Sequence, residues 1–201
     1  MGGGDGGKEI TMANILIHTC CGPCSTYTVE HWRSQKLEVA GLAFNPNIHP
    51  FMEHQQRLES LKTFARMVDM PLYLPAGYDM VNFLRRVVGK EGDRCIECFR
   101  MRLSQTAATA KEKGFDAFTT TLLISPHQKH NLLKEVSEAV AQEQKIRFLY
   151  ADLRSGFTES RRLSKEMGLY RQQYCGCIYS EWERYARITI LSEVSCLPPD
   201  E

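Results

Sequence analysis

The sequence lacks the features that would place a protein in a membrane or on a nucleotide cofactor. No apolar run is long enough to span a bilayer, and no segment resembles a secretory signal peptide. G-x-x-x-x-G-K-[ST] does not occur, and G-x-G-x-x-G occurs only in the Gly-rich residues 2–7, before any predicted strand, so a bound nucleotide is not signalled. We therefore predict a cytoplasmic protein with no membrane partner, in which cysteine thiols stay reduced.

The chain also has almost no excess of charge of either sign. The net charge is only +1, which excludes an obviously nucleic-acid-binding composition. The segment from Arg94 to Arg187 is richer in cations, with 16 Lys and Arg against 11 Asp and Glu. Ten of the 16 are arginine, whose planar fork binds phosphate bidentately. This distribution suits a phosphate-binding surface and an ordinary mixed-charge surface equally well.

The apolar pattern predicts an α/β fold. With 201 residues and 43% hydrophobic content, the chain can bury one core. Short apolar runs alternate with segments of helical spacing, which favours a parallel five-stranded sheet covered on both faces. The strands are predicted at 15–19, 39–44, 72–74, 115–123 and 146–150. A mostly helical part follows from Phe157. We predict a flexible leader at 1–9 and a single α/β domain at 10–201, with Ser25 as the N-cap of the first helix.

Seven of the eight cysteines fall into three tight clusters. The clusters are Cys20, Cys21 and Cys24; Cys95 and Cys98; and Cys175 and Cys177. Buried free cysteines are common, but they usually occur singly and without ligand spacing. C-x-x-C and C-x-C spans let two sulfurs converge on one metal or cluster. The pattern indicates a metal or redox site that tertiary folding assembles.

The predicted topology places this site at one edge of the sheet. In open parallel sheets, ligands bind beyond the carboxyl ends of the strands, at the switch point. Cys20 and Cys21 directly follow the first strand, while Thr120 and Thr121 belong to the end of the fourth. The helix that begins next favours a thiolate or phosphate at its N-terminus.

Three interpretations of the cysteines remain open on the residues alone. Cys21-Gly22-Pro23-Cys24 is the redox tetrad of dithiol oxidoreductases of the thioredoxin type. A structural zinc, as in a zinc-stabilised tRNA-binding module, would take four ligands. Seven cysteines exceed one zinc and also one cubane cluster, which favours two centres. We expect adjacent Cys20 and Cys21 to point in divergent directions and to serve different centres.

Three blocks of the sequence resemble a known family, the cobalamin-independent epoxyqueuosine reductases called QueH. The blocks are His18-Thr19-Cys20-Cys21-Gly22-Pro23-Cys24-Ser25, Asp93-Arg94-Cys95-Ile96-Glu97-Cys98-Phe99-Arg100-Met101-Arg102-Leu103 and Tyr174-Cys175-Gly176-Cys177-Ile178-Tyr179-Ser180. The segment 119–126, TTTLLISP, also matches the family pattern. The resemblance covers about residues 13–190, and no cysteine position departs from it.

The resemblance implies a fold, a reaction and a cofactor. The fold is HUP-like, with residues 20–25 in the place of a pyrophosphate-binding loop. The reaction reduces epoxyqueuosine to queuosine at the wobble position of tRNA, the final step of queuosine biosynthesis, with electrons from a donor. The cofactors are a [4Fe–4S] cluster and an additional mononuclear iron. The implied metal ligands are Cys20, Cys21, Cys24, Cys95, Cys98, Cys175 and Cys177, with Asp93 as an oxygen ligand. Cys20, Cys21 and Asp93 are also expected to be catalytic.

A tRNA substrate would require contacts to phosphates and to an unstacked nucleoside. Proteins recognise single-stranded loops by stacking on aromatic and arginine side chains and by cationic contacts to the backbone. The candidates for substrate binding are Arg100, Arg102, Arg154, Arg161, Arg162, Arg171, Tyr170 and Tyr174. We expect them to form a basic rim around the cysteines.

Overall fold

The structure, a computed structural model, describes residues 13–194 and contains a five-stranded parallel sheet. The strands are β1 (Asn14–His18), β2 (Glu38–Leu42), β3 (Leu72–Tyr73), β4 (Ala117–Thr120) and β5 (Arg147–Phe148). The helices are α1 (Gly22–Ser34), α2 (Phe51–Met67), α3 (Met80–Val87), α4 (Arg94–Glu112), α5 (His130–Gln144), α6 (Phe157–Glu166) and α7 (Ile178–Val194), with two 3₁₀ turns at Thr121–Ile124 and Arg154–Gly156. The predicted leader at 1–9 lies outside the described residues.

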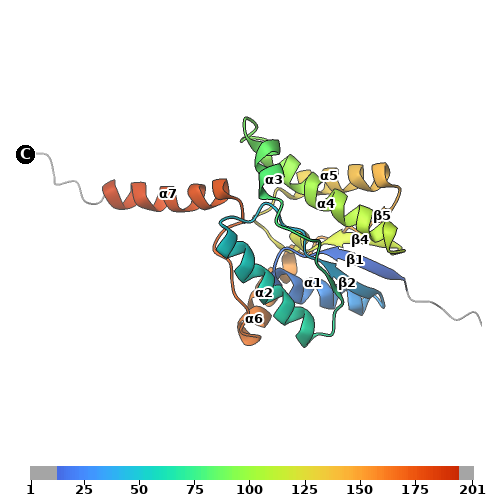
Figure 1. Cartoon of the computed structure of the whole chain (residues 1–201). Helices are drawn as coiled ribbons and strands as arrows, with labels where there is room; N and C mark the ends of the chain where they lie inside the picture. The colour runs from blue at the N-terminus through green and yellow to red at the C-terminus, as the bar shows by residue number, and fades with distance from the viewer. Residues whose placement is uncertain (1–12, 195–201) are drawn as a thin grey trace, which may run out of the picture.

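The central strand β1 divides the core into two layers. Its side chains alternate between the two faces, as the twofold period of a strand requires. Leu16 is fully buried on the face that α4 and α5 cover, whereas Ile15 and Ile17 pack with residues of α1 and α2 on the other face. Figure 1 shows the same arrangement, with α4 and α5 on one side of the sheet and α1, α2 and α6 on the other. Because helices cover both faces of the sheet, we look for a ligand site at the carboxyl ends of its strands.

The strand order is β3-β2-β1-β4-β5, so the order reverses at β1. His18, the last residue of β1, pairs with Leu42 of β2 on one side and Thr120 of β4 on the other. The loops after β1 and β4 therefore leave the sheet side by side, at the switch point where ligands bind in such folds. The predicted α/β, HUP-like architecture with a helical C-terminal part is confirmed.

Besides the shorter β2, β3 and β5, two details differ from the sequence prediction. Helix α1 begins at Gly22, with the extended residue Cys21 as its N-cap, so Ser25 lies inside the first turn and donates its hydroxyl to the carbonyl of Cys21 at 2.8 Å. Pro23 explains the earlier start, because its fixed φ suits the first helical turn. The predicted strand at 115–123 is shorter, since the hydroxyl of Thr120 accepts a hydrogen bond from the backbone N–H of Leu122 and starts a 3₁₀ turn.

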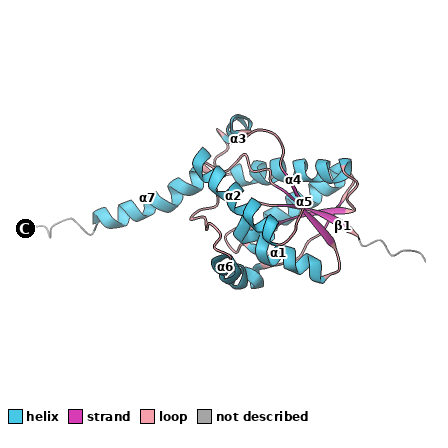
Figure 2. Cartoon of the chain, turned by 60° about the horizontal axis from the view of Figure 1, so that its bottom comes forward, coloured by secondary structure: helices cyan, strands magenta, loops and turns pink. Residues whose placement is uncertain are grey.

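The last helix stands apart from the rest of the fold. In both Figure 1 and Figure 2, α7 projects away from the sheet and its covering helices. Within residues 13–194, no helix combines the length and apolar character that crossing a membrane requires.

Candidate metal centre

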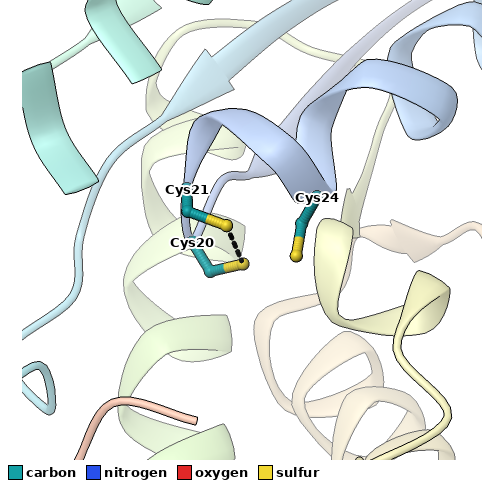
Figure 3. A group of neighbouring side chains, drawn as sticks. All are labelled: Cys20, Cys21 and Cys24. Carbon is teal, nitrogen blue, oxygen red and sulfur yellow. Dashed lines mark hydrogen bonds between the residues drawn. The ribbon is translucent and has the colours of Figure 1, made fainter. Parts of the chain in front are cut away.

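Three sulfur atoms meet at the carboxyl end of β1. Cys20 follows the strand, Cys21 caps α1, and Cys24 lies one turn further along the same helix. Because residues three apart share a helix face, Cys21 and Cys24 project in the same direction. Their sulfurs and that of Cys20 all lie within 4.8 Å of one another (Figure 3). The Sγ atoms of Cys20 and Cys21 are 3.6 Å apart, so the expected divergence of these neighbours is wrong.

The group is asymmetric in charge. Hydrogen bonds from the thiols of Cys21 and Cys24 hold the pKa of Cys20 well below its usual value, and the hydroxyl of Thr121 donates a further one at 3.2 Å. Burial raises the pKa of Cys21, and the hydrogen bonds to Cys20 and Cys21 raise the pKa of Cys24. These shifts favour negative charge on the sulfur of Cys20 over those of Cys21 and Cys24, and the N-terminus of α1 also favours negative charge at this place.

The second pair of cysteines lies on the first turns of α4. Cys98 is buried and packs with Phe83, Met101 and Cys177. Burial raises its pKa to about 12, although the guanidinium of Arg102 acts in the opposite direction. Deprotonation in this apolar position requires a compensating positive charge, which a metal ion supplies when it binds.

The third pair, Cys175 and Cys177, lies in the loop before α7. Burial raises the pKa of Cys95 and of Cys98, and the proximity of Cys175 and Cys177 raises both further, so the second and third pairs lie within electrostatic reach of each other. Cys177 is buried, whereas Cys175 is exposed and accepts a hydrogen bond from Gln128 at 3.4 Å. The fold thus brings distant cysteine pairs into one neighbourhood.

Arg57 of α2 holds this third pair in place. Its guanidinium is 2% exposed and donates to the carbonyl of Cys175 at 2.9 Å and to that of Tyr174 at 3.0 Å. The carboxylate of Glu53 pairs with Arg57 at 2.7 Å and accepts a hydrogen bond from Tyr170. A buried charge is stable only when paired, so this network fixes the C-x-C loop against α2.

Gly176, between Cys175 and Cys177, fits the loop because it has no side chain. Its φ is +146°, and its carbonyl accepts a hydrogen bond from the backbone of His49 at 2.8 Å. A Cβ there would lie 3.2 Å from Ile48 and 3.3 Å from a nitrogen of Arg57.

We expect Gly176→Ala to displace the C-x-C loop and to lower the free energy of unfolding by about 1–3 kcal/mol, the usual cost of a strained backbone. Urea unfolding and iron content after anaerobic reconstitution measure both effects. Gly92→Ala is the matched control, since Gly92 has open space around it and no positive φ. Equal iron content and stability in the two variants would contradict the proposed role of the loop.

A cavity of about 490 Å³ opens above the first sulfur group. Its lining includes Cys20 and Cys24, and it reaches Cys175 of the third pair. The amide of Gln172 lies beside it and donates to the sulfur of Cys21 at 3.1 Å. Basic side chains line the cavity as well: Arg161, Arg171 and Arg184. A ligand in this cavity would touch sulfur and positive charge together.

The predicted substrate-binding residues divide into two groups. Arg161, Arg171 and Tyr174 line the cavity, whereas Arg100, Arg102, Arg154, Arg162 and Tyr170 do not. Arg100 pairs with Glu143, Arg154 with Asp152, and Arg162 with Glu159 and Glu166. Tyr170 bonds to Glu53, and Arg102 is 2% exposed, so burial removes it from any basic rim. Asp93 is the exposed residue before α4 and is not among the carboxylates and sulfurs that gather into a metal-binding group in the described part of the chain.

The structure also identifies site residues that the sequence pattern did not. Gln172 and Gln128 donate to cysteine sulfurs, and Arg57 fixes the C-x-C loop. Gln172 and Gln128 are common polar residues in segments without a motif, and Arg57 lies in an ordinary amphipathic helix. The one signal for Arg57 is its position on the buried face of α2, where an arginine is unusual.

The donor set fits a soft metal. All seven cysteines in the described chain are free thiols, and thiolates suit iron–sulfur clusters and zinc. The group of Cys20, Cys21 and Cys24 offers three sulfurs and faces a cavity, which leaves room for a further ligand on the metal. Such an open position distinguishes catalytic from structural metal sites.

Fold and site together define an α/β protein in which three cysteine sulfurs at the switch point of the sheet could hold a metal ion. Comparisons with known proteins identify the family. The profile of "Epoxyqueuosine reductase QueH" matches residues 15–183. Proteins of that name are 44% identical in Dehalococcoides mccartyi, over 86% of this chain and 95% of theirs, and 31% identical in Thermotoga maritima, over 86% and 93%. The chain belongs to the QueH family of epoxyqueuosine reductases and is an oxidoreductase.

A solved structure resembles the fold at much lower sequence identity. It is described as a predicted subunit of tRNA methyltransferase from Methanocaldococcus jannaschii, with a TM-score of 0.53 and 10% identity over 77% of this chain and 76% of that one. At this identity the likeness concerns the fold alone.

Proposed function

We propose that the chain reduces the epoxide of epoxyqueuosine to the alkene of queuosine at the wobble position of tRNA. The observation that carries the proposal is the cavity that joins Cys20, Cys24 and Cys175 to arginine side chains in a QueH-family fold. The reaction consumes two electrons and two protons and releases the epoxide oxygen as water. The enzyme therefore needs an electron donor and a redox centre beside the substrate.

The cofactors proposed are a [4Fe–4S] cluster and an additional mononuclear iron. Their ligands would come from the seven clustered cysteines, with Asp93 as the oxygen ligand suggested by the family resemblance. When bound, these centres supply single electrons and a Lewis acid for the C–O bond. The structure does not divide the sulfurs between the two centres.

The chain's own residues prepare this site. Thr121 and Gln172 donate hydrogen bonds to the sulfurs of Cys20 and Cys21, which fixes the direction of the sulfur lone pairs. The Arg57–Glu53 pair holds the loop that carries Cys175 at the cavity. Substrate binding in a cavity of about 490 Å³ would displace water from the sulfurs and strengthen the electrostatic interactions there.

The tRNA backbone would bind the cationic side of the cavity. Arg161 and Arg171 line it, and neither forms an ion pair with a carboxylate of the described residues. Guanidinium groups that are free of carboxylates suit phosphate at a cavity mouth, because each can donate two parallel hydrogen bonds. Tyr174 offers an aromatic face for a base.

We expect Arg161→Gln with Arg171→Gln to weaken binding of an anticodon stem-loop and to flatten its salt dependence. For single strands, each phosphate that is no longer neutralised lowers the slope of log K against log salt by about 0.7. Fluorescence anisotropy across a salt series measures the slope. Arg162→Gln is the matched control, because its guanidinium is already neutralised by Glu159 at 2.6 Å. A double variant that binds like the control would exclude these arginines from the tRNA interface.

The proposed reaction is tested by nucleoside analysis. The anaerobically reconstituted protein is incubated with tRNA carrying epoxyqueuosine and with dithionite, and the digested nucleosides are separated by mass. The expected product is queuosine, lighter than the substrate by one oxygen atom. Protein that contains its metal but leaves the epoxide intact would contradict the proposal, as would metal-independent reduction of disulfides by Cys21 and Cys24.

A further inference from the structure

Arg102 of α4 is a buried guanidinium attached to one cysteine. It is 2% exposed and is among the largest fully buried side chains in the described structure. Its Nε donates to the carbonyl of Cys98 at 3.0 Å, and its Nη2 donates to the sulfur of Cys98 at 3.2 Å. Its Cζ lies 5.7 Å from the centre of the Phe99 ring. One side chain thus forms hydrogen bonds with both the backbone carbonyl and the sulfur of Cys98.

A buried cation needs an anion close by, since removing a charge from water costs several kcal/mol unless it is paired. The other deeply buried arginine, Arg57, meets this need with the carboxylate of Glu53 at 2.7 Å. Arg102 has no carboxylate within ion-pair distance among residues 13–186, whose side chains the structure describes. In that same part of the chain, the sulfur of Cys98 is its only hydrogen-bond partner able to carry negative charge.

We propose that Arg102 is a positioning residue that sets the charge balance of the metal centre through Cys98. The inference rests on the proposed function, in that Cys98 must be a ligand of the iron–sulfur cluster. Hydrogen bonds to cluster sulfurs and nearby positive charge stabilise the reduced, more negative state, and so raise the reduction potential. Arg102 supplies both effects from a position that no substrate can reach, which explains an arginine at a fully buried site.

The test compares variants at positions 102 and 100 of the same helix. Arg100 is half-exposed and pairs with Glu143 at 2.8 Å, so Arg100→Gln removes an equal charge from the surface of α4. The cluster of each anaerobically reconstituted protein is titrated in a spectroelectrochemical cell. We expect Arg102→Gln to disfavour reduction at least tenfold, about 59 mV for a one-electron couple, and Arg100→Gln to match the wild type. Equal potentials for the two variants would overturn the proposal.

Two further measurements keep the result decisive. If Arg102→Gln does not retain a cluster, Arg102→Lys and Arg102→Met are compared for iron and sulfide content. Recovery with lysine alone supports the role of the buried charge, and equal loss with both residues refutes it. The wild type is reconstituted first: a wild type without a cluster would contradict the proposed function itself, whereas a loaded wild type with unaltered variants contradicts only the role of Arg102.

Discussion

Replacing one cysteine in each of the three clusters is expected to abolish reduction of the tRNA epoxide. The variants are Cys20→Ser, Cys95→Ser and Cys175→Ser. Each removes a soft sulfur ligand and leaves a hydroxyl, which binds iron of a cluster poorly. Changing even an outer-shell partner of a metal ligand typically costs about 10–100-fold, so loss of a ligand should reduce turnover by on the order of 100-fold or more.

Nucleoside analysis of the tRNA product measures turnover, and iron and sulfide analysis measures the site. Cys196→Ser is the control for the loss of a thiol, since Cys196 lies outside the three clusters and outside the described residues. We expect it to behave as the wild type. If Cys95→Ser and Cys175→Ser were as active as this control, only the first cluster would belong to the site.

The second large effect is expected from Arg57→Met. The substitution leaves Glu53 buried with Tyr170 as its remaining partner, and it frees the carbonyls of Tyr174 and Cys175. Breaking a buried ion pair from one side typically costs about 3–5 kcal/mol. We expect a loss of this size in the free energy of unfolding of the metal-free chain, together with reduced iron incorporation.

Arg33→Met is the matched control for this substitution. Arg33 also donates to two carbonyls, those of Val68 and Asp69, but it is exposed and pairs with no buried carboxylate of the described chain. Urea unfolding should show a loss below about 1 kcal/mol for this variant, as for most surface substitutions. A comparable loss in both variants would show that Arg57 stabilises the fold no more than an ordinary surface arginine.

The positions of the cysteines in the fold follow from the sequence to a large extent. The buried strand before Cys20 and the alternation of strands and helices predict both the parallel sheet and the edge at which the site lies. Side-chain direction could not be predicted in this way. The sulfurs of Cys20 and Cys21 lie 3.6 Å apart at the extended N-cap of α1, and the spacing of adjacent residues in the sequence does not give this separation.

The arginines show a second limit of sequence patterns. Charge spacing alone cannot distinguish Arg102, which is buried beside Cys98, from Arg171, which lines the cavity. The distinction depends on which face of α4 packs on the sheet and on which loop borders the cavity. Both are tertiary properties, so a basic rim predicted from composition contained residues of both kinds.

The most direct test is the content of iron and acid-labile sulfide in the wild-type chain purified and reconstituted under argon. A [4Fe–4S] cluster with a further iron requires about five irons and about four sulfides per chain, with brown colour near 400 nm. A measured content of four irons or fewer per chain would exclude the proposed additional mononuclear iron. A colourless chain with one zinc and no sulfide would contradict the proposal that the three cysteine clusters build an iron–sulfur redox centre.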